Sequence, residues 1–155
     1  MNLQETLQVH CSSPTEYLGT SVLGGDGVAF GGQMAAQALV AAQAHDPSRL
    51  PQSIHSFFLN SARPEQPIAH NIDVLRAGRA FSSVRVETVQ GDRHCVSSVV
   101  SFHNAERAPE HQLGKPDTGA PETYPLSHYI PPGTDPAVRQ CFEIRSVGSR
   151  SDIEN

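Results

Sequence analysis

A pair of glycines stands directly before a run of helix-forming residues, and this arrangement suits the binding of a carbonyl oxygen. Phe30, Gly31, Gly32 and Gln33 precede an alanine-rich segment. The first backbone N–H groups of a helix have no partner within it, and the helix dipole favours negative charge beside them. Because glycine lets a ligand approach the backbone closely, we expect Gly31, Gly32 and Gln33 to bind substrate. The alternative is that the glycines only form a tight turn into the helix.

Two further side chains are candidates for catalysis. Gln37 lies one turn along the predicted helix, and its amide is suited to orienting a water molecule. His55 lies on a later predicted strand, and its imidazole is suited to taking a proton or polarising a carbonyl. We therefore predict that Gln37 and His55 are catalytic. The structural alternatives are that Gln37 bonds to a partner domain and that His55 is a partly buried side chain beside Phe57 and Leu59.

Charged side chains on the predicted turns are candidates for phosphate binding or acid catalysis. Arg79 is predicted to bind substrate, since a guanidinium suits a phosphate group, and Arg76 and Arg85 lie nearby in the sequence. A solvated hairpin explains these arginines equally well. Asp26 lies in the loop before the helix, where turn formation is the better explanation and acid catalysis the alternative.

The composition argues against several other classes of function. The formal net charge is −5 and no run of Lys or Arg is present, so nucleic-acid binding is not expected. The three cysteines and eight histidines show no zinc spacing, so we expect neither a metal nor another cofactor. Residues 27–34 have the glycine spacing of a phosphate-binding loop, but Gln33 and Met34 replace the required Lys and Ser or Thr. Without a signal sequence or a long apolar run, we expect a cytoplasmic protein with no membrane contact.

The periodicity of the sequence predicts an α+β domain over residues 1–104. A strand over residues 15–21 and a glycine-rich loop precede a helix over residues 32–44, which ends before Asp46 and Pro47. Four strands follow, over residues 52–59, 68–76, 82–89 and 95–103. Turns at residues 77–79 and 90–92 predict that these strands form an antiparallel meander. Alanines on the helix would let a curved sheet close around it, as in the hotdog fold, although other α+β folds share this order.

The composition changes after Asn104. Seven of the twelve prolines lie in residues 105–155, together with Gly114, Gly119 and Gly133. Such a composition predicts an extended linker or a loosely packed tail.

Several segments together resemble the TesB-like family of acyl-CoA thioesterase II. Residues 30–39, FGGQMAAQAL, resemble the F-G-G-Q-x-x-x-Q-A-L segment that opens the first helix of the family. Residues 54–59, IHSFFL, resemble its H-S-x-F-L strand, and residues 72–82, IDVLRAGRAFS, resemble its V-x-x-L-R-D-G-R-S-F-S hairpin. Residues 98–102 and 109–112 extend the similarity, which covers residues 15–112 in order. Ala77 replaces the hairpin acid and Gln52 replaces a second histidine, so no function tied to those positions is carried over.

The resemblance implies the N-terminal half of a double-hotdog enzyme that acts on acyl-CoA. The water-activating Asp, Thr and Gln of the family belong to the second repeat, of which residues 142–147 resemble only the opening strand. The comparable positions here are Gln37, Gln52 and Ser101, and none is a carboxylate. We predict hydrolysis of acyl-CoA to fatty acid and CoA by an activated water, in a homo-oligomer or a pair with a second hotdog. The alternatives are a non-catalytic acyl-CoA-binding or interaction half and a truncated fragment of a longer thioesterase.

Overall fold

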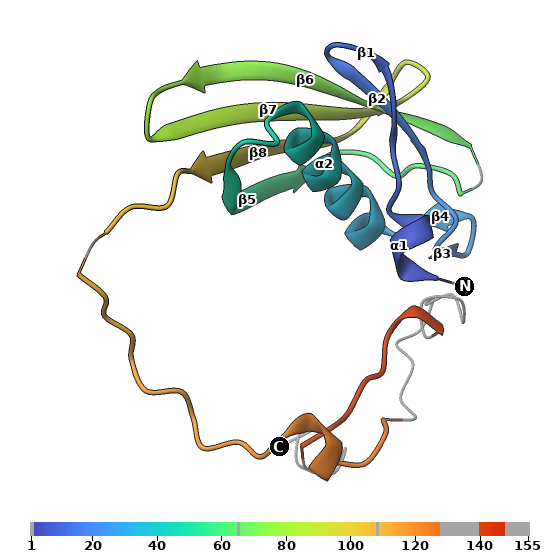
Figure 1. Cartoon of the computed structure of the whole chain (residues 1–155). Coiled ribbons are helices and arrows are strands. Elements are labelled where there is room, and N and C mark those ends of the chain that lie inside the picture. The colour runs from blue at the N-terminus through green and yellow to red at the C-terminus, as the bar shows by residue number, and fades with distance from the viewer. Residues whose placement is uncertain (1, 65, 108, 128–139, 148–155) are drawn as a thin grey trace.

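One antiparallel sheet and one long helix make up the domain in the computed structural model, which describes residues 2–64, 66–107, 109–127 and 140–147. Helix α1 (Leu3–Thr6) and strands β1 (His10–Ser13) and β2 (Glu16–Thr20) precede a short hairpin, β3 (Gly24–Gly25) and β4 (Val28–Ala29). Helix α2 (Gly31–His45) follows (Figure 1). The later elements are β5 (Leu50–Phe58), β6 (Pro67–Ala77), β7 (Phe81–Gln90), β8 (Arg93–His103) and the 3₁₀ turn η1 (Pro121–Thr123).

The large sheet has the strand order β1-β2-β6-β7-β8-β5, and α2 lies across one face of it (Figure 1). Alternate residues of the central strands point toward α2, so that in β7 Val84 and Val86 are buried while Arg85 between them is exposed. Small residues let the curved sheet approach the helix closely. The main core cluster contains Tyr17, Ala38, Ala41, Ala42, Ile72, Val84, Val86, Val100 and Phe102. This arrangement confirms the predicted hotdog fold.

The predicted meander is wrong in one respect. Strands β6, β7 and β8 do follow one another across the sheet, but β5 pairs with β8 at the sheet edge and not with β6. The physical reason lies in the connections: short turns join β6 to β7 and β7 to β8, whereas residues 59–66 carry the chain from the edge back to β6.

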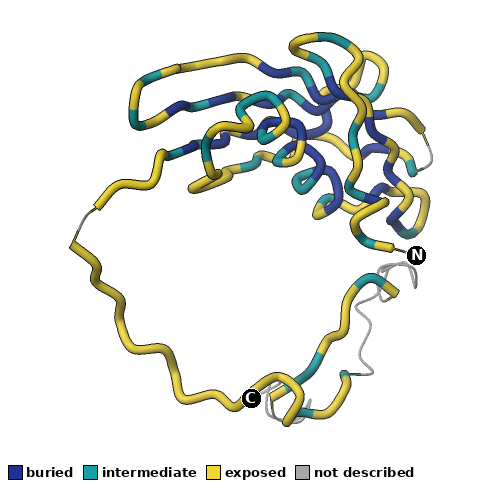
Figure 2. The backbone as a smooth tube through the Cα atoms, viewed as in Figure 1, coloured by how far each residue is buried: buried dark blue, intermediate teal, exposed yellow. Residues whose placement is uncertain are grey.

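The short elements near the N-terminus were absent from the sequence prediction. Neither α1 nor β1 was expected, and the glycine-rich loop contains the β3–β4 hairpin. Beyond the sheet, the described residues include η1 and a single antiparallel bridge between Leu126 and Arg145. Ser127 N–H donates to the Ile144 carbonyl at 2.8 Å beside this bridge. Figure 2 shows that most of this later stretch is exposed, in contrast to the strands that face α2.

Candidate acyl-CoA site

The start of α2 has backbone N–H groups without a partner among the described residues, and aromatic side chains pack closely around them. Phe30 is the N-cap and provides no side-chain cap, while the N–H groups of Gln33 and Met34 donate to its carbonyl at 3.0 and 3.3 Å. The N–H groups of Gly31 and Gly32 precede these first helical bonds. A Cβ added to Gly31 would lie 2.8 Å from Cε1 of Phe58, and one added to Gly32 would lie 2.6 Å from Cε1 of Phe30. Both phenyl rings are exposed. Because glycine has no side chain, the rings can lie close to the N–H groups of Gly31 and Gly32.

These two glycines are not explained by a left-handed turn. Among the described residues, the glycines with positive φ are Gly27 and Gly91. The φ angles of Gly31 and Gly32 are therefore open to other residues, and the close approach of the rings is what their lack of a side chain permits. Asp26, with φ of 52°, and Gly27, with φ of 74°, instead form the turn between β3 and β4.

Gln33 is buried and its side chain is fully engaged with protein groups. Its Oε1 accepts hydrogen bonds at 3.2, 3.1 and 2.9 Å from Ser21 Oγ, Val22 N and Leu23 N. Its Nε2 donates at 2.7 and 3.1 Å to the carbonyl oxygens of Thr6 and Thr20. The side chain thus connects three segments of the chain, and a contact with substrate would require some of these bonds to break.

Gln37 lies one turn further along α2 and is also fully buried. Its Nε2 donates to the same two carbonyls, Thr6 at 3.0 Å and Thr20 at 3.2 Å. Its Oε1 is buried without a hydrogen-bond partner among the described residues. The amide lies against Gly19, where an added Cβ would come within 3.2 Å of it. In a single unit, Gln37 therefore has no access to a water molecule on the surface.

His55 lies on the opposite face of the sheet from α2. Its ring contacts that of Phe57, with centroids 4.7 Å apart, and it pairs in register with the exposed Val99. Ile54 and Phe58 point to the other face, because side chains alternate along a strand. The structure thus does not bring Gln37 and His55 together, and their catalytic roles remain predictions.

Arg79 lies at the far end of α2 from the glycines. The helix has 15 residues, so its ends are roughly 22 Å apart. At this end, Asp46 is the C-cap and its carboxylate accepts a hydrogen bond from Arg49 Nη1 at 2.9 Å, while Arg49 Nη2 donates to the Gly78 carbonyl at 3.0 Å. Burial raises the pKa of Asp46, but hydrogen bonds from Ser82, Ser48 and Arg49 outweigh burial and hold that pKa below its ordinary value. This network anchors the hairpin that presents Arg79.

Two serine pairs join β5 to β8. Ser53 and Ser101 hydroxyls lie 2.8 Å apart on the outer side, and Ser101 also donates to Gln52 Oε1 at 3.2 Å. Ser56 and Ser98 hydroxyls lie 2.8 Å apart on the side that faces α2. The sequence analysis missed this second pair. The signal was present, because Ser98 occupies a position where the alternation of β8 predicts a buried residue.

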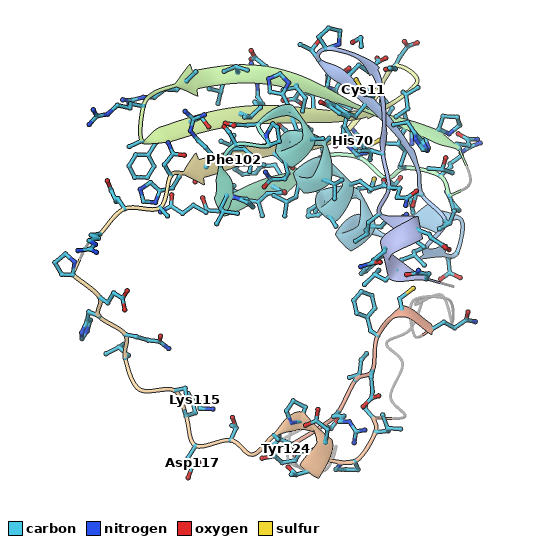
Figure 3. All side chains as sticks on the ribbon, in the orientation of Figure 1. Cys11, His70, Phe102, Lys115, Asp117 and Tyr124 are labelled. Atoms are coloured by element: carbon cyan, nitrogen blue, oxygen red, sulfur yellow. The ribbon has the colours of Figure 1, made fainter. Side chains whose placement is uncertain are left out.

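His70 is a fully buried histidine on β6 beside α2 (Figure 3). Its Nδ1 lies 3.0 Å from Thr88 Oγ1, and its Nε2 has no partner among the described residues. Burial lowers the pKa of His70 from 6.5 to about 4. In the described ranges, no group of three or more acidic, Cys or His side chains is placed to hold a metal ion. The helices of those ranges are too short or too polar to span a membrane.

Residues 22–103 match the family model described as the acyl-CoA thioesterase N-terminal domain. The chain belongs to this family. Acyl-CoA thioesterase 2 of Haemophilus influenzae is 38% identical over 96 residues, which cover 61% of this chain and 34% of that protein. The peroxisomal acyl-coenzyme A thioester hydrolase 1 of Saccharomyces cerevisiae is 32% identical over 115 residues, covering 71% of this chain and 32% of that protein. The chain thus spans about a third of the length of these curated relatives.

Solved structures agree with the family membership. Acyl-CoA thioesterase II TesB2 from Mycobacterium marinum superposes with a TM-score of 0.71 at 30% identity, over 80% of this chain and 47% of that chain. A tesB protein of Mycobacterium avium subspecies paratuberculosis superposes with a TM-score of 0.73 at 28% identity, over 78% of this chain and 48% of that one. The chain is an acyl-CoA thioesterase hotdog domain homologous to TesB, and it aligns with about half of each solved chain.

Proposed function

We propose that this chain hydrolyses acyl-CoA to fatty acid and CoA when it is paired with a second hotdog unit, in cytoplasmic fatty acid metabolism. The observation that carries the proposal is the unpaired edge of β5, which ends beside the glycines at the start of α2. The names of the bacterial and yeast relatives, both thioester hydrolases of acyl-CoA, supply the substrate class.

The exposed edge of β5 is suited to pairing. Within the described sheet, β5 is one of the two edge strands and bonds to β8 alone. It contains neither Asp, Glu, Lys nor Arg. Phe57 and Phe58 at its end are 60% and 58% exposed. Domains that stay single usually protect such an edge with charges, bulges or prolines, and here Pro51 and the neighbouring irregularity lie only at the beginning. A second strand would satisfy the free backbone groups and bury the aromatic side chains.

Two-fold pairing would join residues that a single unit keeps apart. Strands related by a two-fold axis run antiparallel, so Leu50 of one unit would lie near Phe58 of the other. Phe58 contacts Gly31, whereas Leu50 pairs with His103 beside the hairpin of Arg79. The glycines of each unit and the Arg79 hairpin of the other would then lie at the same end of the assembly.

The chemistry proposed for this composite site follows from these groups. The N–H groups of Gly31 and Gly32 bind the thioester carbonyl and stabilise the oxyanion that forms as water attacks. Arg79 of the other unit binds a phosphate of CoA. The group that deprotonates the water comes from the second unit. A direct role for Gln37 or His55 requires these side chains to change position on pairing.

The experiment is thiol release from short, medium and long acyl-CoAs by wild type, Gly31→Ala and Arg79→Ala. Gly114→Ala and Arg107→Ala are matched controls, since both residues are exposed and lie outside the proposed site. We expect release by the wild type and controls, about tenfold or greater loss in Gly31→Ala, and a raised KM in Arg79→Ala. Equal rates in all five proteins would contradict the proposed site.

A non-catalytic acyl-CoA-binding half is the second candidate function. The positions of Gln37 and His55 favour it, because neither side chain reaches the glycines within a single unit. It predicts that calorimetry detects binding of acyl-CoA while no thiol is released. The absence of both binding and release would contradict both functions.

A further inference from the structure

The N-terminal helix α1 is too short to be stable without outside support. It has four residues, whereas isolated helices of fewer than about 12 residues are marginal in water. Gln4 and Glu5 are exposed, and the buried residue is Thr6. Asn2 caps the first turn by accepting from Gln4 N–H at 3.0 Å. Thr6 is thus the buried point of attachment of α1, with Leu3 and Leu7 half-buried on either side of it.

Two side-chain amides converge on the carbonyl oxygen of Thr6. Gln33 Nε2 donates to it at 2.7 Å and Gln37 Nε2 at 3.0 Å, both in a buried setting. Each amide gives its second N–H to the Thr20 carbonyl at the end of β2. The orientation of the Gln33 amide is fixed independently, because backbone N–H groups of Val22 and Leu23 donate to its Oε1.

Gln33 also connects this contact to the proposed carbonyl-binding donors. It lies in the first turn of α2, immediately after Gly31 and Gly32. Leu23, which donates to Gln33, accepts in turn from the N–H of Phe30 at 2.8 Å. A continuous set of hydrogen bonds therefore links α1, the loop of residues 21–23 and the residue that caps α2.

We propose that Gln33 is a positioning residue, and that α1 is a latch whose attachment through Gln33 and Gln37 fixes the first turn of α2. The part of this inference that concerns catalysis rests on the proposed function, whereas the mechanical coupling between α1 and α2 does not. Gln37 attaches α1 without bonding to the loop of residues 21–23, so its loss should loosen α1 most and residues 21–34 only through the release of α1. The loss of Gln33 should loosen both segments.

Amide hydrogen exchange of the full chain, followed by mass spectrometry of peptides, tests the coupling. The variants are Gln33→Met and Gln37→Met, with Gln4→Met as the matched control on the exposed side of α1. We expect Gln33→Met to accelerate exchange by about tenfold in both residues 2–8 and residues 21–34, since methionine removes the hydrogen bonds that Gln33 makes to both segments. Gln37→Met should accelerate residues 2–8 and, to a smaller extent, residues 21–34, whereas Gln4→Met should accelerate neither. Acceleration by Gln33→Met in only one of the two segments would overturn the proposal.

A deletion of residues 1–8 gives an independent test if Gln33→Met does not fold. The latch predicts that the deletion accelerates exchange in residues 21–34 several-fold while leaving β7 unchanged. Unchanged exchange in residues 21–34 would overturn the proposal.

Kinetics then separates the latch from the proposed function. If the paired protein hydrolyses acyl-CoA, Gln33→Met should lower kcat about tenfold with KM altered less than twofold, because only the carbonyl donors are displaced. An equal loss in Gln4→Met, or a change in KM alone, would contradict a positioning role. Failure of the wild type to hydrolyse acyl-CoA would sink the proposed function and leave the exchange result as the test of the latch.

Discussion

Acid should destabilise this protein through His70, and the size of the effect follows from its burial. Its pKa is lowered by burial to about 4 in the folded state, against the ordinary value of 6.5. Between these two values the unfolded chain binds a proton that the folded chain does not, so stability falls as the pH falls. The loss begins near pH 6.5, is complete below about pH 4, and amounts to about 2 kcal/mol between about pH 7 and pH 5.

Urea denaturation at these two pH values measures this loss. The wild type should lose about 2 kcal/mol more free energy of unfolding than His70→Gln over the same interval. His111→Gln, at an exposed position, should lose as much as the wild type. The other histidines are shared by all three proteins, so their contribution cancels. An equal loss in His70→Gln and wild type would refute the reasoning from burial.

Three further predictions concern packing, charge and the sheet edge. Gly24→Ala places a Cβ against the backbone carbonyl of Val28 on the facing strand, which cannot move aside, so urea denaturation should show that the free energy of unfolding falls by about 3 kcal/mol. Asp46→Asn leaves Arg49 without its charged partner, so the free energy of unfolding should fall by about 2 kcal/mol at neutral pH. This difference from the wild type should shrink in acid, because the wild-type carboxylate then becomes protonated. Ile54→Lys adds a charge to β5 and should shift light scattering toward single chains.

Much of the fold was predictable because its patterns are local. The helix predicted over residues 32–44 is α2 (Gly31–His45), and the last three predicted strands match β6, β7 and β8 within two residues at each end. Apolar periodicity and turn residues specify such elements directly. The place of β5 was not predictable in this way, because strand order depends on contacts between residues distant in sequence. Helix α1 was missed because it has only four residues and because Gln33 and Gln37, which donate to Thr6, are distant from it in the sequence.

The candidate site was predicted in its parts but not in its arrangement. The glycines do open a helix, as the sequence predicts. The roles of Gln33 and Gln37 depend on burial beneath β2, which no local pattern reveals. Side chains alternate between the two faces of β5, and the strand register places His55 on the face away from α2. The length of α2 separates Arg79 from Gly31. Residue type therefore suggested the chemistry, while the packing of the sheet on α2 determined which groups can act together.

The most direct test of the central claim is thiol release per chain as a function of protein concentration, with light scattering on the same samples. The account predicts that release from acyl-CoA rises with the fraction of paired chains, and that Ile54→Lys stays at the buffer rate throughout. Release that is independent of pairing, or no release from fully paired chains, would contradict the claim that two hotdog units joined at β5 form the thioesterase.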